Sequence, residues 1–101
     1  MEKSFANYPS LRGKNILITG GASGIGKELV KAFAEQESNV AFLDLNAVAG
    51  EELCLDIGKN VFFEKCDLRE VDKLKSSIEK LRSKLGLFDV LVNNPLSKAP
   101  C

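Results

Sequence analysis

A run of apolar residues leads directly into a cluster of glycines between positions 14 and 26. Ile16, Leu17 and Ile18 are followed by glycines at 20, 21, 24 and 26. From residue 24 to about residue 36, apolar residues recur at the spacing of one helix face. This order predicts a strand, a tight turn and a helix. The first N–H groups of a helix lack intrahelical partners and lie at the positive end of its dipole, so the turn is a predicted seat for an anion, most often a phosphate.

The alternation of strands and helices continues through the rest of the sequence. Apolar or β-rich runs at residues 40–43, 61–66 and 87–92 predict three further strands. Residues 47–57 predict a second helix, with Asn46 as its cap, Val48 and Leu53 on one side and Gly50 weakening the pattern. A third helix is predicted over residues 71–85, with Val71 at the start of its apolar face and Gly86 as its C-cap.

Strands joined by helical crossovers predict one parallel sheet with right-handed connections. The expected fold class is therefore α/β, a doubly wound parallel sheet of about four strands and three helices in the order 3-2-1-4. We expect a lead-in over residues 1–13, a single domain over residues 14–94, and a divergent, unstructured tail over residues 95–101.

Composition narrows the class of partner. Fourteen basic and fourteen acidic residues give a formal net charge of zero, which offers no case for nucleic acid or an anionic membrane. The three cysteines, Cys54, Cys66 and Cys101, have neither metal-ligand nor redox-motif spacing. No signal peptide or membrane-spanning run is recognisable. We therefore expect a cytoplasmic protein with reduced thiols and no metal site.

Asp44 adds a second half to the predicted anion site. It follows the second apolar run, 18 residues after Gly26. An acidic side chain at the end of this strand can accept hydrogen bonds from ribose hydroxyls, as dinucleotide sites require. Two plainer interpretations stay open for Asp44, which are a helix N-cap and a solvated loop acid.

Four separated motifs resemble the short-chain dehydrogenase/reductase family. They are Thr19-Gly20-Gly21-Ala22-Ser23-Gly24-Ile25-Gly26, Leu11-x-Gly13-Lys14, Cys66-Asp67-Leu68 and Asn93-Asn94. The motifs stand in the family's order and cover almost the whole chain up to Asn94. The resemblance implies the NAD-binding, Rossmann-like half of an NAD(P)-dependent oxidoreductase that acts on alcohol or carbonyl groups.

The resemblance also implies roles for individual residues. The backbone around Gly20, Ser23, Gly24, Ile25 and Gly26 would hold the pyrophosphate of the dinucleotide.

The remaining roles fall on residues that follow the other strands. The resemblance places Asp44 on the adenine ribose, Asp67 and Leu68 beside the adenine, and Asn93 near the nicotinamide-side ribose. Asp67 is alternatively a cap for the third helix. The Asp44 carboxylate would repel a 2′-phosphate, and neither Ser23 nor Leu45 and Asn46 supply a cation, so NAD is favoured over NADP.

The sequence departs from the family after Asn94. Pro95 and Leu96 stand where the family has alanine and glycine, and the catalytic serine and Tyr-x-x-x-Lys pair are missing. The single tyrosine, Tyr8, is followed four residues later by Arg12, and the chain has no histidine. No catalytic residue is predicted, so a truncated form without catalytic activity is expected, with a small-molecule substrate only for a full-length form. The alternative is a free-standing dinucleotide-binding or regulatory module that performs no chemistry.

Overall fold

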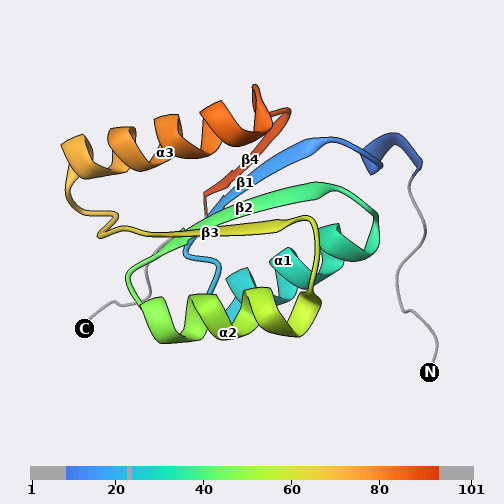
Figure 1. Cartoon of the computed structure of the whole chain (residues 1–101), viewed down its shortest axis with the longest axis horizontal. Helices are drawn as coiled ribbons and strands as arrows, with labels where there is room; N and C mark the ends of the chain where they lie inside the picture. Colours follow the sequence, from blue (N-terminus) through green and yellow to red (C-terminus); the bar gives the residue numbers. More distant parts are fainter. Residues whose placement is uncertain (1–8, 23, 94–101) are drawn as a thin grey trace.

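The computed structural model describes residues 9–22 and 24–93. Its elements are a short 3₁₀ helix η1 (Pro9–Leu11), β1 (Asn15–Thr19), α1 (Gly24–Glu35), β2 (Asn39–Asp44), α2 (Ala47–Ile57), β3 (Val61–Lys65), α3 (Val71–Leu85) and β4 (Val90–Asn93). All strand pairs are parallel and the sheet order is β3-β2-β1-β4, which confirms the predicted fold class and topology (Figure 1).

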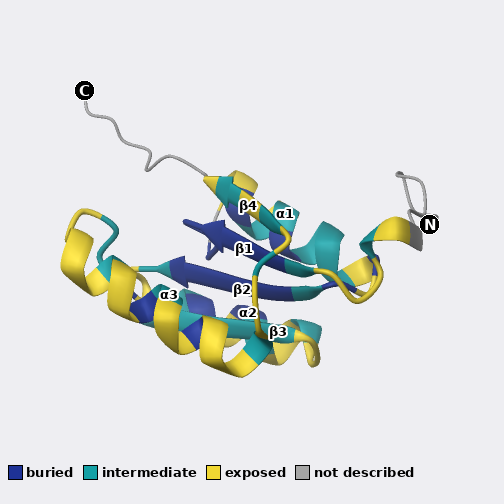
Figure 2. Ribbon diagram, turned by 90° about the horizontal axis from the view of Figure 1, so that it is seen from above, coloured by how far each residue is buried: buried dark blue, intermediate teal, exposed yellow. Residues whose placement is uncertain are grey.

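Helices cover both faces of the sheet. Side chains alternate along a strand, so Ile16 and Ile18 of β1 pack in the core under α1 and α2, while Leu17 packs in the core under α3. Figure 1 shows α1 and α2 on one side of the sheet and α3 on the other. The central strands β1 and β2 are almost wholly buried, whereas β3 and β4 are only partly covered (Figure 2).

The second helix begins and ends as its sequence predicts. The Asn46 side chain accepts a hydrogen bond from the N–H of Ala49, which confirms the predicted N-cap. Gly50 fits this helix because α2 lies close to β3: a Cβ at position 50 would stand 2.5 Å from Cζ of Phe63. Val48 was predicted to share one side of this helix with Leu53, which is wrong, since Val48 is 67% exposed whereas Leu53 is 3% exposed. The buried face of α2 instead contains Gly50 and Leu53.

The third helix ends at the predicted glycine. Gly86, with φ of 95°, donates its N–H to the carbonyl of Arg82. The predicted apolar face begins one turn too early, because Val71 is 60% exposed and the buried positions start further along the helix. Glu70, not Asp67, is the N-cap of α3, so the capping role considered for Asp67 is wrong.

The fourth strand starts later than the sequence predicts. Asn15 Nδ2 donates hydrogen bonds of 2.9 Å to the carbonyls of both Leu85 and Leu87. Asn15 and Asp89 also exchange two bonds, from Asn15 N to Asp89 Oδ2 at 2.8 Å and from Asp89 N to Asn15 O at 2.7 Å. Residues 86–89 are therefore held as a connection against the start of β1, and strand pairing begins only at Val90.

Two of the three cysteines lie in the described part of the chain. Cys54 and Cys66 are both free thiols, and Cys101 lies outside the described residues. Within the described part of the chain, the helices are all too short or too polar to cross a membrane.

The contact between α2 and β3 predicts the effect of replacing Gly50 with alanine. Alanine would favour the helix by about 1 kcal/mol. Its methyl group would however overlap the Phe63 ring, which stacks on Phe42 with a centroid distance of 5.1 Å and cannot shift freely. Contacts this close put the cost of overpacking near the upper end of its usual range, about 3 kcal/mol, so after subtraction of the helix gain Gly50→Ala should lower the free energy of unfolding in urea by about 2 kcal/mol. The control, Glu51→Ala on an exposed neighbouring position, should stay within about 0.5 kcal/mol of wild type. A Gly50→Ala variant as stable as wild type would contradict this packing.

Candidate functional site

The residues predicted to bind a dinucleotide lie at one edge of the sheet. All four strands are parallel, so their carboxyl ends meet there. The glycine-rich turn follows β1, Asp44 ends β2, Asp67 and Leu68 follow β3, and Asn93 ends β4. Ser23, Asn94 and Pro95 lie outside the described residues.

The first half of the glycine-rich turn is fastened to the end of β2. Gly20 N and Gly21 N both donate to the carbonyl of Leu43, at 2.7 and 3.3 Å. Ala22 N donates to Asp44 Oδ2 at 3.0 Å. Gly21 also has no room for a side chain, since a Cβ there would lie 2.7 Å from Cβ of Phe42. These N–H groups hold the turn in place, which leaves anion binding to the second half of the turn.

The second half of the turn opens into α1. Gly24 has a φ of +60° with open space where a Cβ would stand. Ile25, which the helical pattern places on the apolar face, is instead 73% exposed. The first turn of α1 contains no acidic side chain to offset the positive end of the helix dipole. This end of the helix suits a bound phosphate.

Asp44 connects the glycine-rich turn to the end of β2. Its Oδ2 accepts from Ala22 N, and its Oδ1 accepts from Asn46 N at 3.0 Å. Asp44 is not the N-cap of α2, because Asn46 fills that position. A carboxylate has about four acceptor positions, so the described residues leave two of them for hydroxyl donors of a ligand. The carboxylate is half-buried and fixed by two backbone donors before any ligand arrives.

A lysine that sequence reasoning missed lies beside this carboxylate. Lys65 ends β3 in register with Asp44, so the two side chains leave the same face of the sheet on neighbouring strands. The sequence predicted no cation from Ser23 or from the two residues that follow Asp44. The shared position of Asp44 and Lys65 at the ends of predicted neighbouring strands is the signal that could have found it.

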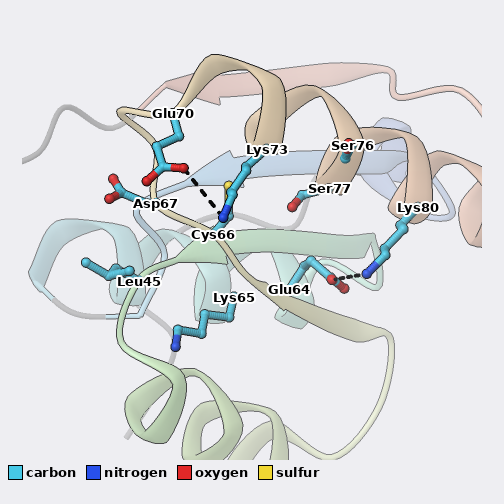
Figure 3. Close-up of a pocket in the computed structure, with 10 residues that line it drawn as sticks. All are labelled: Leu45, Glu64, Lys65, Cys66, Asp67, Glu70, Lys73, Ser76, Ser77 and Lys80. Carbon is cyan, nitrogen blue, oxygen red and sulfur yellow. Dashed lines mark hydrogen bonds and ion pairs between the residues drawn. The ribbon is translucent and has the colours of Figure 1, made fainter.

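A hollow of about 470 Å³ lies between the end of β3 and α3 (Figure 3). The residues that line it are Leu45, Glu64, Lys65, Cys66, Asp67, Glu70, Lys73, Ser76, Ser77 and Lys80. Asp67 and Leu45 stand at the end of the hollow where β2 and β3 stop (Figure 3). The Arg69 side chain binds the Asp67 carboxylate, and its hydrogen bonds lower the pKa of Asp67 to about 2. Asp67 is thus ionised at neutral pH and stands at the end of this hollow.

The ends of β1 and β4 are tied by side chains. Thr19 Oγ1 donates to Asn93 Oδ1 at 2.9 Å, and the two residues are register partners. In the order β3-β2-β1-β4, the strands on either side of β1 are reached by connections that run in opposite directions, so the sheet has its topological switch point between β1 and β4. Ligands of such sheets bind in the crevice outside the carboxyl ends of the strands at this point.

Metal-ligating side chains are not gathered anywhere in residues 9–22 and 24–93. No group of three or more His, Cys, Asp or Glu side chains in these ranges has the geometry to hold an ion. The polar groups at the sheet edge are instead backbone donors and single carboxylates, which suit a ligand with phosphates and hydroxyls.

Comparisons with known proteins agree on one family. The family model described as short chain dehydrogenase matches residues 14–95. The probable galactose dehydrogenase of Rhizobium meliloti (strain 1021) is 41% identical over 93 residues, covering 88% of this chain and 36% of that protein. The 3-beta-hydroxysteroid dehydrogenase of Comamonas testosteroni is 38% identical over 84 residues, covering 83% of this chain and 33% of that protein.

A solved structure shares both sequence and fold with the chain. It is the 3-ketoacyl-(acyl-carrier-protein) reductase from Brucella melitensis, crystallised in complex with NADH. It matches with a TM-score of 0.77 and 31% identity, over 80% of this chain and 33% of that one. The chain therefore spans about a third of the length of these relatives. The sheet order, the glycine-rich turn and these matches together show that the chain belongs to the short-chain dehydrogenase/reductase family.

Proposed function

We propose that residues 14–94 form the cofactor-binding half of an NAD-dependent oxidoreductase. The observation that carries the proposal is the Asp44 carboxylate at the end of β2, held against the glycine-rich turn by its bond to Ala22 N. One fixed carboxylate is thereby set beside the open N-terminus of α1. A ribose and the phosphate attached to it need this pairing of a hydroxyl acceptor with an anion seat.

The rest of the sheet edge supports an extended dinucleotide. The backbone of residues 23–26 would hold the pyrophosphate at the start of α1, with Gly20 shaping the turn through its positive φ of 74°. Asp67 and Leu68 would flank the adenine beside the hollow at the end of β3. Asn93, tied to Thr19 at the switch in strand order, would lie near the nicotinamide-side ribose.

The cofactor supplies hydride transfer when it is bound. The residues of this chain would bind and orient it, and none of them is proposed to be catalytic. The only tyrosine, Tyr8, lacks a lysine four residues later, and the sequence contains no histidine. A polypeptide of these 101 residues is therefore proposed to lack oxidoreductase activity, with residues 1–13 as a lead-in and 95–101 as a tail.

The relatives are described with different substrates. The relatives named above are described as acting on a galactose, a hydroxysteroid and a ketoacyl group, although each matches this chain over about a third of its own length. Enzymes with different substrates can share a segment that binds their common cofactor, which supports a cofactor-binding role for this segment. Zero net charge and the free thiols Cys54 and Cys66 support a cytoplasmic protein without a nucleic-acid partner.

Calorimetric titration of the purified chain tests the proposal. Because the contacts at hand serve the adenosine and pyrophosphate, NAD and ADP-ribose should bind about equally, with dissociation constants of about 0.1–1 mM, or roughly 4–5.5 kcal/mol. Nicotinamide mononucleotide should bind more weakly than either. Micromolar binding of NAD would instead favour a free-standing binding module. Absence of ADP-ribose binding at millimolar concentration would contradict a cofactor-binding role for this chain.

Selectivity for NAD over NADP is proposed to come from Asp44. Its carboxylate, with two acceptor positions left for ribose hydroxyls, would repel a 2′-phosphate, while Lys65 on the neighbouring strand would attract it. The Asp44→Asn substitution should therefore raise affinity for NADP relative to NAD by about tenfold, the equivalent of about 1.4 kcal/mol. Adding Lys65→Met to this variant should reverse most of the gain.

The control for this pair is Asp56→Asn on the exposed side of α2. It removes the same charge from the last turn of α2, at the opposite end of that helix from Asp44, and should leave the ratio of affinities unchanged. Thermal melts of each variant should accompany the titrations, because Asp44 also holds the N–H of buried Ala22. If Asp44→Asn folds and keeps the wild-type ratio, the proposed basis of selectivity is wrong.

A further inference from the structure

The strand β4 forms an open edge of the sheet. In the order β3-β2-β1-β4 it lies at one margin, and among the described strands it pairs with β1 alone. Figure 2 shows β4 at this margin, beside β1. Successive residues of a strand direct their backbone N–H and C=O groups to opposite sides, so the groups of β4 that face away from β1 can pair with a further strand.

One face of β4 is covered and the other is open. Val90 and Val92 are half-buried and pack with the core beneath α1 and α2. Leu91, on the opposite face, is 63% exposed. Its register partner on β1 is Leu17, which is 3% exposed and packs with α3. The third helix therefore covers this face of the sheet over β1 and leaves it open over β4.

The residues of this edge follow a pattern that is nearly symmetric about Leu91. Their order is Asp89-Val90-Leu91-Val92-Asn93. When two antiparallel copies of the segment are paired with Leu91 opposite Leu91, each Val90 lies opposite Val92 of the other copy. Side chains alternate along a strand, so the valines then meet on one face of the joined sheet and the leucines meet on the other.

The polar ends of the segment complement each other in this register. Asp89 and Asn93 are both exposed, and the register places Asp89 of one copy opposite Asn93 of the other. Asn93 accepts a hydrogen bond from Thr19 through Oδ1, and its Nδ2 donates to no other described residue. A carboxylate only accepts hydrogen bonds, whereas an amide nitrogen has two to donate. The segment thus pairs an acceptor with a donor at both ends.

Neighbouring registers lack this complementarity. With the centre of the pairing moved to Val92, the exposed Leu91 of one copy would lie opposite Asn93 of the other. With the centre moved to Val90, Leu91 would lie opposite Asp89. Both shifts place an apolar side chain against a polar one, so the register centred on Leu91 is favoured.

We propose that two copies of this polypeptide associate through their β4 strands, antiparallel about a two-fold axis at Leu91, which joins the two four-stranded sheets into one. A two-fold interface uses the same surface on both copies, so that surface must complement itself, as residues 89–93 do. The formal net charge of zero gives no overall repulsion between the copies. The dimer does not depend on the proposed cofactor site and forms whether or not NAD is bound.

The other edge of the sheet is a poorer surface for a second copy. The strand β3 carries Glu64 and Lys65, and charged side chains at an edge oppose strand pairing, whereas residues 90–93 are uncharged. Phe62 and Phe63 pack in the cores on opposite faces of the sheet, so helices cover both faces of β3. A contact between β4 and β3 of another copy would also leave free edges and grow into open chains, whereas two β4 strands close the assembly.

Sedimentation equilibrium of the full 101-residue chain tests the proposal. The interface is small, so the wild type should dimerise with a dissociation constant of about 0.1 mM. Leu91→Lys places two like charges opposite each other and should raise this constant at least about tenfold. The control, Leu55→Lys on α2, changes a side chain that is 82% exposed and should leave the constant unchanged. Both variants should melt near the wild-type temperature because both positions are exposed.

A mixture of two variants tests the register. Leu91→Lys and Leu91→Glu should each stay monomeric alone, because position 91 would meet an identical charge. Mixed in equal amounts, they should form a one-to-one heterodimer, because opposite charges then stand across the axis. Only the register centred on this position brings the two substituted side chains directly opposite each other.

NMR spectra of the wild type at increasing dilution locate the interface. Amide shifts that depend on concentration should centre on residues 89–93 and be absent from α2. A wild type that stays monomeric at about 1 mM, or that grows into larger particles instead of dimers, would overturn the inference. Shifts centred on β3, a Leu91→Lys variant that dimerises like the wild type, or a mixture that stays monomeric would overturn it equally. These measurements use no dinucleotide, so their failure leaves the proposed function standing.

Discussion

The hydrogen bond from Ala22 N to Asp44 Oδ2 joins the two parts of the chain on which everything at the sheet edge depends. Without it, the bonds that remain among the described residues are those from Gly20 N and Gly21 N to the carbonyl of Leu43 and the one from Asn46 N to the Asp44 carboxylate. With it, the turn after β1 and the end of β2 form one rigid corner. The start of α1 and the carboxylate then keep a constant separation, which a ligand spanning both requires.

The two ends of the sheet use polar side chains for different purposes. At the amino ends, Asn15 satisfies carbonyls at the end of α3 and also accepts a bond of 3.1 Å from Asn39 Nδ2, so its donors and acceptor are consumed by the protein. At the carboxyl ends, Asp44 and Asp67 each keep acceptor positions after their internal bonds are counted. This difference in unfilled hydrogen-bonding capacity separates the candidate site from the structural polar network.

Sequence reasoning succeeded where local patterns decide the structure. The four apolar runs and the three helices follow from periodicity, and the strand order follows from crossover geometry. It failed where contacts between distant segments decide. The start of β4 depends on Asn15, some seventy positions earlier in the chain, and the face of α2 that is buried is the one through which Gly50 meets Phe63 of β3. Neither feature can be predicted from the residues in its own segment of the sequence.

Contacts that the local sequence pattern does not reveal also limited the prediction of the site. Glycines and acidic residues at strand ends were found because the family motifs and the strand pattern both point to them. Lys65 was missed because its position beside Asp44 is a matter of register between strands. Arg69 was missed because a side chain that turns back on a residue two positions earlier has no periodic signature.

Asp44 also shows why stability and cofactor choice are coupled in such a corner. Its Oδ2 accepts the N–H of Ala22, a residue only 4% exposed, and leaving a buried donor without a partner costs about 1–3 kcal/mol. A residue that admits a 2′-phosphate must lack the negative charge, yet it must still offer an acceptor to Ala22. Few side chains meet both demands, and asparagine meets them only by giving up the bond from Asn46 N. The change of cofactor preference at this position is therefore constrained by the fold of the turn as much as by the ligand.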